Sequence, residues 1–237
     1  DWRVTFWVLA AVGALCFVLT VLFKETLPKD ARYQGSVLGS LCNLGVVAKN
    51  KGFISFLLII GMFNLPFMAY IAVASYVYID FFGLDEMGYS IYFAIAALLT
   101  AVGPFIWLVA QKFMNASRFT SIILTIAGLS GVAMLCVGQI SPTLFCVTFL
   151  LFAVMQACAR PYSTNILLSQ QDDDTGAASS LINFLHTAVG SLGMVIAVLP
   201  WANYVEGVGV IIVASMIIAG LGWFALLRSN APLKGVK

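Results

Sequence analysis

Seven long apolar runs, each of about 20 residues or more, constrain this chain more than any other feature. A helix needs about 20 apolar residues to cross the hydrocarbon core of a bilayer. The runs are too long for barrel strands and lack the alternation of such strands, so they predict transmembrane helices. The predicted spans cover residues Val4–Phe23, Phe53–Ile79, Tyr89–Ala110, Phe119–Gly138, Thr143–Leu168, Ser179–Leu199 and Val208–Leu227.

The composition is typical of an integral membrane protein. Hydrophobic residues make up 62% of the sequence and charged residues 9%, whereas soluble domains carry about 25% charged residues. We therefore expect an all-α integral membrane protein with seven transmembrane helices. The net charge of +2 gives no case for a nucleic-acid partner.

The sequence carries no pattern typical of an enzyme or a metalloprotein. An odd count of five cysteines without paired spacing argues against a disulfide framework and a zinc site, and a single histidine excludes a His-rich metal site. There is no catalytic triad with credible placement and no phosphate-binding loop. We expect no cofactor, no metal and no enzymatic activity.

Basic residues indicate the orientation of the spans. Lysine and arginine outside the apolar runs gather in the first loop, the third loop and the C-terminal tail, and only Arg3 falls on the opposite side. Because short cytoplasmic loops carry an excess of such residues, these loops and the C-terminus are predicted to be cytoplasmic. The ten residues on this side are Lys24, Lys29, Arg32, Lys49, Lys51, Lys112, Arg118, Arg228, Lys234 and Lys237.

Loop lengths divide the chain into one helix and a group of six. The first connection holds about 29 residues, whereas every other loop holds about 10 or fewer, and short loops make antiparallel neighbours. The predicted parts are a single helix over 1–23, a basic cytoplasmic linker over 24–52, a six-helix domain over 53–228 and a cytoplasmic tail over 229–237. The chain starts at Asp1, on the predicted outer side, so we expect an N-terminal part to precede it.

One helix plus six, joined by a long cytoplasmic link, resembles the second half of a major facilitator transporter together with its sixth helix. "DWRVTFWVLAAVGALCFVLTVLFKETLP" at the N-terminus is similar to the sixth helix of the bicyclomycin- and chloramphenicol-resistance type (Bcr/CflA) of drug:proton antiporter. "SYVYIDFFGL", "ARPYSTN" and "GAASSLINFLHTAVGSLG" are similar to later segments of that family and occur in the same order. The resemblance covers essentially the whole chain.

The resemblance implies a function. Relatives of this type export small amphipathic drug-like molecules from the cytoplasm, driven by inward flow of protons, and reside in the bacterial inner membrane as multi-pass proteins. The acidic residues that usually carry the proton lie in the N-terminal half of such transporters, which this chain does not include. The implied partners are the drug-like substrate, protons, the lipid bilayer and an N-terminal half, with self-association of the chain as a further possibility.

Arg160 is the one formally charged residue inside a predicted span, and a charge at the bilayer centre costs about 2.5–3.5 kcal/mol on insertion scales. Gln156, Arg160 and either Ser163 or Thr164 share one helix face, which should point toward the bundle interior or a watery cavity. Two interpretations stay open: Arg160 binds an anionic group of a substrate or tunes a carboxylate in the other half, or it is a structural clamp on carbonyls or on Asp172–Asp174.

Two further spans contribute candidate residues for a substrate cavity. Asn64 and Met68 lie one helical turn apart in the second span, and methionine suits adaptable binding surfaces. Asn183 and His186 lie on a polar stripe of the sixth span, which runs on to Gly190. Simple packing is the alternative for all four residues, and a proton relay is a further interpretation of His186.

Three prolines and two small residues predict local features of the helices. Pro66, Pro104 and Pro161 each remove a backbone donor and are predicted kinks or gates. Ser191 and Gly193 are predicted to let another helix approach closely.

Two alternatives from other classes stay open. A self-contained seven-helix receptor-like protein fits the seven spans, although the long first loop suits it poorly and the last span lacks the lysine of a retinal protein. A membrane scaffold without transport activity is the other alternative.

Overall fold

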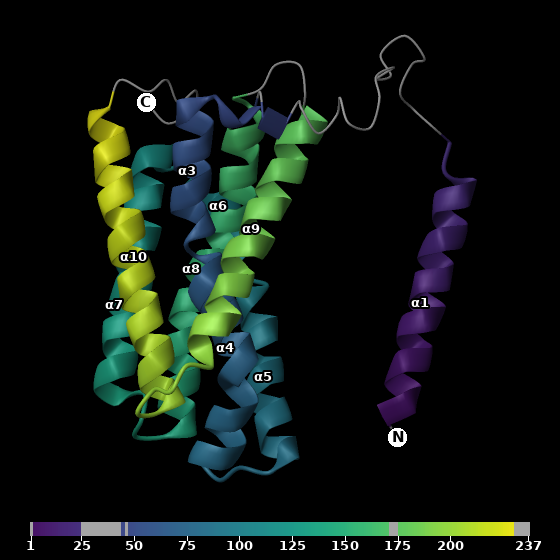
Figure 1. Ribbon diagram of the computed structural model, residues 1–237, viewed down its shortest axis with the longest axis vertical. Coiled ribbons are helices and arrows are strands. Elements are labelled where there is room, and N and C mark those ends of the chain that lie inside the picture. The colour runs from purple at the N-terminus through teal and green to yellow at the C-terminus, as the bar shows by residue number, and fades with distance from the viewer. Residues whose placement is uncertain (1, 25–43, 46, 171–174, 230–237) are drawn as a thin grey trace. The chain divides into compact units, whose positions relative to one another are not determined.

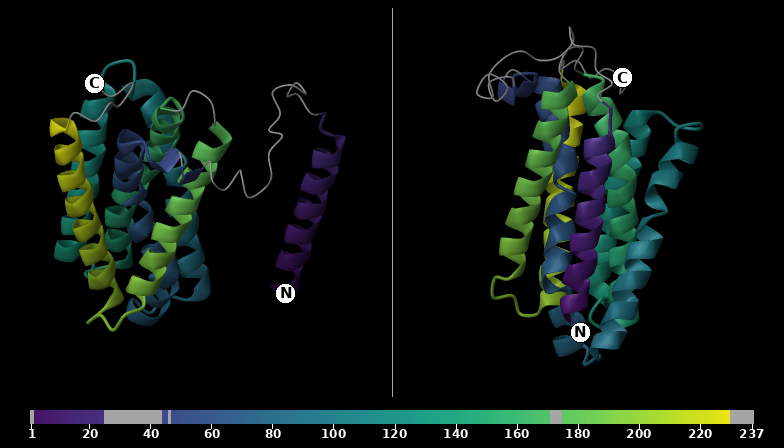
Figure 2. Two further views of the ribbon diagram at one scale, coloured as in Figure 1. Left: turned by 45° about the horizontal axis from the view of Figure 1, so that its top comes forward. Right: turned by 90° about the vertical axis from the view of Figure 1, so that its right-hand side faces the viewer.

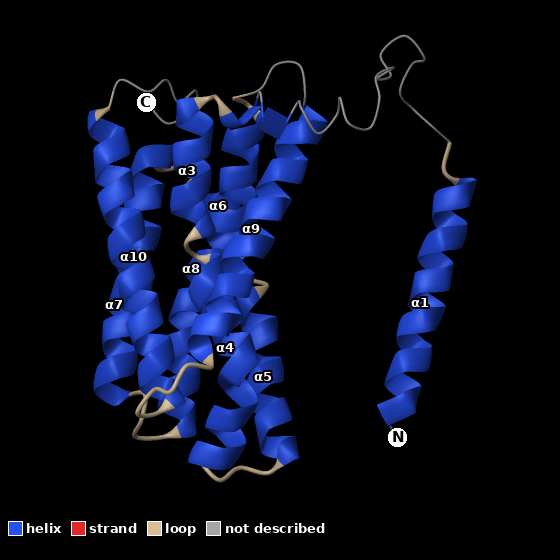
Figure 3. Ribbon diagram, viewed as in Figure 1, coloured by secondary structure: helices blue, strands red, loops and turns tan. Residues whose placement is uncertain are grey.

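The computed structural model describes residues 2–24, 44–45, 47–170 and 175–229 of the chain. All regular structure in these residues is helical, with no strand among them (Figure 3). The chain divides into two compact units, residues 1–37 and 38–237, which are described separately below. Most of the predicted linker, almost all of the predicted tail and Asp172–Asp174 lie outside the described residues.

The first unit contains helix α1 (Trp2–Leu22), with 21 residues and no charge between Val4 and Leu22. At 1.5 Å per residue the helix is about 31 Å long, which matches the thickness of a bilayer core. Taken by itself, the first unit buries no described side chain of α1. Such a surface suits a helix whose apolar side chains contact lipid or another protein.

The second unit is a bundle of six membrane spans (Figures 1 and 2). Together with α1 they make seven candidate spans in the described residues, which confirms the seven predicted ones, and each boundary agrees within four residues. The helices are α3 (Lys51–Gly61), α4 (Asn64–Ser75), the π-helix η2 (Tyr76–Phe81), α5 (Glu86–Thr100), α6 (Gly103–Ala110), α7 (Ala116–Val137), α8 (Pro142–Leu168), α9 (Thr175–Ala197) and α10 (Tyr204–Arg228).

Two of the six spans are interrupted close to a proline. The first is divided into α3 and α4 at Met62 and Phe63, and the second into α5 and α6 at Ala101 and Val102. A proline cannot donate to the carbonyl four residues earlier, and its ring crowds that carbonyl. For Pro66 this carbonyl belongs to Met62, at the first interruption.

The same relation holds in the second span, where Pro104 faces the carbonyl of Thr100, the last residue of α5. Pro161 behaves differently, because α8 continues through it without an interruption. A gating role for any of the three prolines stays a prediction.

Side-chain caps fix where several helices begin. Asp85 accepts a hydrogen bond from the backbone N–H of Gly88 at 2.8 Å, and Asn203 accepts one from Glu206 at 2.8 Å. Ser141 caps α8 in the same way. Each such cap satisfies a backbone donor that the first turn of a helix leaves free, so polar residues at the loop ends set the helix starts.

Glycines allow the closest helix contacts of the bundle. The most extensive contacts join α4 with α9, α10 with α7, and α7 with α8. A Cβ atom at Gly193 of α9 would lie 2.0 Å from the backbone oxygen of Leu65 in α4. The predicted close approach at Gly193 is therefore present, whereas Ser191 is exposed within the six-helix unit and its predicted helix contact stays a prediction.

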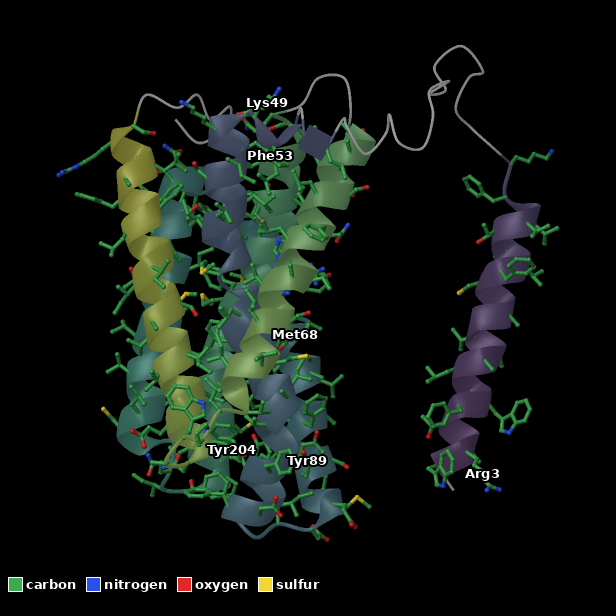
Figure 4. All side chains as sticks on the ribbon, viewed as in Figure 1. Arg3, Lys49, Phe53, Met68, Tyr89 and Tyr204 are labelled. Carbon is green, nitrogen blue, oxygen red and sulfur yellow. The ribbon has the colours of Figure 1, made fainter. Side chains whose placement is uncertain are left out.

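Charges separate to the two ends of the six-helix unit. The described lysine and arginine residues other than Arg160 lie at one end, here called the basic end, and the described acidic residues lie at the opposite, acidic end. Figure 4 shows Lys49 at the basic end, Tyr89 and Tyr204 toward the acidic end, and Met68 between them. The basic set is Lys49, Lys51, Lys112, Arg118 and Arg228, and the acidic set is Asp80, Asp85, Glu86 and Glu206.

Candidate functional site

An open groove of about 780 Å³ runs along the seam between the α5–α6 span and α8. Its volume falls in the range of about 300–1,000 Å³ that small-molecule sites occupy. Small side chains of α5 and polar side chains of α8 form its walls. The lining residues are Ala97, Thr100, Ala101, Pro104, Gln156, Ala157, Arg160, Pro161, Thr164, Asn165 and Leu168.

Arg160 lies in this groove, in the half nearer the basic end. It lies eight positions before Leu168, the end of α8, which is about 12 Å along the helix axis. Its side chain is exposed within the six-helix unit. In the described part of the chain, the guanidinium donates no hydrogen bond and forms no ion pair. The site therefore holds a cation within a membrane span without a described counter-charge.

Helical spacing places the polar neighbours of Arg160 in the same groove. Gln156 and Thr164 lie one turn before and one turn after Arg160, and both line the groove, as their shared face predicts. Thr164 donates its hydroxyl to the backbone oxygen of Arg160 at 2.9 Å. Ser163 makes a similar bond but is buried, so Thr164 is the one that joins the polar face.

Gly103 sets the distance between the two walls beside Pro104. A Cβ atom at Gly103 would lie 2.5 Å from Cβ of Ala157 in α8, so only glycine permits this approach. The thiol of Cys158 donates to the backbone oxygen of Gly103 at 3.1 Å. The start of α6 is thus fixed against α8 at the wall of the groove.

A second, smaller pocket of about 230 Å³ adjoins the groove on the side toward the acidic end. It shares Ala97 and Thr100 with the groove, so the two spaces adjoin at these residues. Its other walls are apolar, and aromatic rings from three helices supply half of its lining. The pocket is lined by Phe67, Tyr70, Ile71, Phe93, Ala96, Ala97, Thr100 and Phe149.

The rings around this pocket pack face to face. Tyr70 of α4 stacks on Phe149 of α8 with ring centroids 3.5 Å apart, and it stacks on Phe93 of α5 at 6.4 Å. The hydroxyl of Tyr70 lies 3.5 Å from that of Tyr78, which is fully buried. These rings join the three helices that surround the pocket.

Three of the predicted cavity residues lie elsewhere, at the contact between α4 and α9. Asn64 is buried and donates its side-chain amide to the backbone oxygen of His186. Met68 approaches Gly190, where an added Cβ would lie 2.8 Å from Cγ of Met68. None of these residues lines the groove, and their part in substrate binding stays a prediction.

His186 is buried, and neither ring nitrogen has a hydrogen-bond partner among the described residues. His186 lies on α9 and is not among the residues that line the groove.

Asn183 lies on another face of α9, together with Thr187 and Ser191. All three side chains are exposed and hydrogen-bond to carbonyls of their own helix. The predicted polar stripe of this span therefore divides. His186 and Gly190 face the bundle, whereas Asn183 lies on a polar outer face.

Sequence reasoning missed the residues that complete the groove. Ala97 and Thr100 of α5 carry no signal of their own, because small residues are common in transmembrane helices. The aromatic pocket was missed as well, since Tyr70 and Phe149 lie far apart in the sequence. Spacing from Pro104 was the one available signal, because Thr100, Ala101 and Pro104 fall within about one turn.

Two comparisons bear on the family. A family profile described as "Major Facilitator Superfamily" matches residues 1–194, which include every residue that lines the groove. A protein of Bacillus subtilis (strain 168) named "Uncharacterized MFS-type transporter YdgK" is 26% identical over 234 residues. The alignment covers 97% of this chain and 58% of that relative, so the chain spans little more than half of the relative's length. The chain belongs to the Major Facilitator Superfamily.

Proposed function

We propose that this chain forms the C-terminal half of a secondary active transporter that exports amphipathic drug-like molecules in exchange for protons. It resembles drug:proton antiporters of the bicyclomycin- and chloramphenicol-resistance type, and it acts as a transporter rather than an enzyme. The multi-pass protein lies in the bacterial inner membrane with its C-terminus in the cytoplasm, as the gathering of basic residues at one end favours.

The observation that carries the proposal is the groove around Arg160. A cation within a membrane span normally faces a bundle interior or a watery path, and marks a route for substrate or ions. Arg160 has no described partner and shares its groove with Gln156 and Thr164. In transporters of this architecture the substrate site lies at the interface between repeats near the membrane midplane. We propose that the groove is the wall that this half contributes.

Proton coupling is assigned to an N-terminal half. The described acidic residues of the six-helix unit lie at its acidic end and not near mid-span. A carboxylate within the membrane that takes up the proton is therefore proposed to lie on the other half, within reach of Arg160.

The test is co-expression of this chain with the N-terminal six-helix half that the proposal requires, in a drug-sensitive bacterium. Recovered resistance, with export that collapses when the proton gradient is dissipated, is the expected result. Stable membrane insertion of both halves without export would contradict the proposal and favour the scaffold alternative.

A variant series sharpens this test. Arg160→Ala should reduce export at least tenfold while the amount of protein in the membrane stays within twofold, because the groove loses its charge. Arg118→Ala is the matched control, since Arg118 is an exposed cation at the start of α7 that does not line the groove. An equal loss of export and protein in Arg160→Ala would favour the structural clamp.

A further inference from the structure

The groove and the aromatic pocket adjoin each other and differ in chemistry, and we treat them as the polar section and the aromatic section of one candidate site. Ala97 and Thr100 line both spaces. The polar section contains Arg160 and Gln156, and the aromatic section contains the stacked pair Tyr70 and Phe149. A ligand that occupies both sections must carry matching chemistry at its two ends.

The aromatic section suits a flat ring. Four aromatic side chains contribute to its walls, and the polar surface that it presents is small relative to the apolar surface. Aromatic rings pack favourably in offset or edge-to-face contacts with other rings. The narrow seam between α4, α5 and α8 therefore favours an aryl group over a bulky branched one. The rings that line the section are those of Phe67, Tyr70, Phe93 and Phe149.

The polar section suits an anion. A guanidinium presents N–H donors in a planar fork that matches a carboxylate with two parallel hydrogen bonds. The side-chain amide of Gln156 makes no hydrogen bond within the described residues and offers a further donor at the same wall. Among the residues that the structure describes, no acidic residue lines either section, so a cationic ligand finds no described counter-charge there.

The distance between the sections sets the size of the ligand. Phe149 and Arg160 are eleven positions apart on α8, which is about 16 Å along the axis. The Cα–Cβ bond of a helical residue tilts toward the N-terminal end of its helix, which at Arg160 is the direction of the aromatic section. A ring joined to a carboxylate by a short flexible chain fits this spacing.

We propose that this site binds aromatic organic anions, with the aryl ring in the aromatic section and the carboxylate at Arg160. The role of these anions as transported substrates rests on the proposed function above, whereas their binding does not. The proposal narrows the substrate class from amphipathic molecules in general to aryl carboxylates and related anions.

The experiment measures binding of three isosteric probes to the purified chain in detergent micelles by calorimetry. The probes are 4-phenylbutanoate, its neutral amide, and 4-phenylbutylammonium. The carboxylate is expected to bind about tenfold tighter than the amide, which corresponds to one charge-assisted hydrogen-bond pair, and the ammonium probe should bind most weakly. Equal affinity for all three probes, or a preference for the ammonium, overturns the proposal.

Variants test the contribution of each section to probe binding separately. Arg160→Gln should abolish the preference for carboxylate over amide, and Arg160→Lys should keep part of it, whereas Arg118→Gln should leave it unchanged. Ala97→Phe should weaken both neutral and anionic probes at least tenfold, because Ala97 lies where the two sections meet. Ala94→Phe is the matched control, since Ala94 is an exposed residue of the same helix that lines neither section.

A preference for carboxylate that survives in Arg160→Gln, in protein whose thermal unfolding is unchanged, contradicts the proposal. Transport assays in the co-expressed pair separate this inference from the proposed function. Export coupled to protons but selective for cations refutes the inference alone. Selective binding of the carboxylate without any export refutes the proposed function alone.

Discussion

Asn64 donates a hydrogen bond from its side-chain amide to the backbone carbonyl of His186, and this bond joins α4 to α9. The donor lies at the first residue of α4, directly after the interruption at Met62 and Phe63. Both partners are buried. Helix α4 makes its most extensive contact with α9. The bond therefore holds the divided span, at its interruption, against that helix.

Replacing Asn64 tests the strength of this connection. Asn64→Leu removes the donor, and the carbonyl of His186 then keeps only its bond within α9, so we expect a loss of about 0.5–1.5 kcal/mol in the free energy of unfolding. Asn183→Leu is the control, because the Asn183 side chain is exposed and bonds only to the carbonyl of Ser179 on its own helix. Unfolding in mixed micelles measures both variants, and an equal effect of the two would refute the role of the bond.

Gly193 tests the close packing of α9 on α4. In Gly193→Ala the new methyl group would overlap the backbone oxygen of Leu65, and the two helices must separate at a cost of about 1–3 kcal/mol or more. Gly220→Ala in α10 is the matched control, since a Cβ there meets nothing within 4 Å. The control should be neutral or more stable by up to about 1 kcal/mol. A thermal shift assay that ranks the two variants in the opposite order would contradict the packing.

The substitution His186→Gln tests whether His186 only packs between helices or also relays protons during transport. A relay needs partners within hydrogen-bond reach on both sides, and the ring nitrogens of His186 have none among the described residues. We therefore expect the pH profile of transport by the co-expressed pair to keep its midpoint, whereas protein stability falls modestly. A displaced midpoint at unchanged expression would instead assign the proton pathway to His186.

The orientation in the membrane can be measured with single cysteines in a background where the native cysteines are replaced by serine. The two substitutions are Lys112→Cys, at the basic end of the six-helix unit, and Asp85→Cys, at its acidic end. A membrane-impermeant thiol reagent added to intact cells should label position 85 and spare position 112 until the membrane is opened. The reverse pattern would invert the predicted topology.

The spans were predictable because the bilayer imposes a length and a composition on each of them. The interruption before Pro66 follows from the chemistry of one residue, which the sequence displays directly. The sequence does not show that the polar stripe of α9 divides between two faces. Helical spacing relates His186 to Asn183, but it leaves open which neighbouring helix each side chain contacts. That outcome depends on Gly193 and Gly190, whose small size lets α4 approach on one side only.

The groove also depends on contacts between helices that the sequence does not display. Arg160 and Gln156 were predicted to share a polar face, since their spacing on one helix requires it. Their opposite wall was not predictable, because Ala97 and Thr100 are small residues whose importance arises only from the contact between the α5–α6 span and α8. The aromatic section likewise depends on Tyr70 meeting Phe149, which is a tertiary contact between distant segments.

The most direct test of the account is the solvent accessibility of position 160 in the membrane-embedded, co-expressed pair. In the cysteine-free background, Arg160→Cys should react with a small charged thiol reagent that does not enter lipid, because the groove opens to water. Leu221→Cys is the control of similar depth, since Leu221 lies on the exposed apolar face of α10 and is 66% exposed within the chain. The account predicts labelling at 160 and none at 221. Equal protection of both positions, with labelling of both by a lipid-soluble reagent, would place Arg160 against acyl chains and contradict the account.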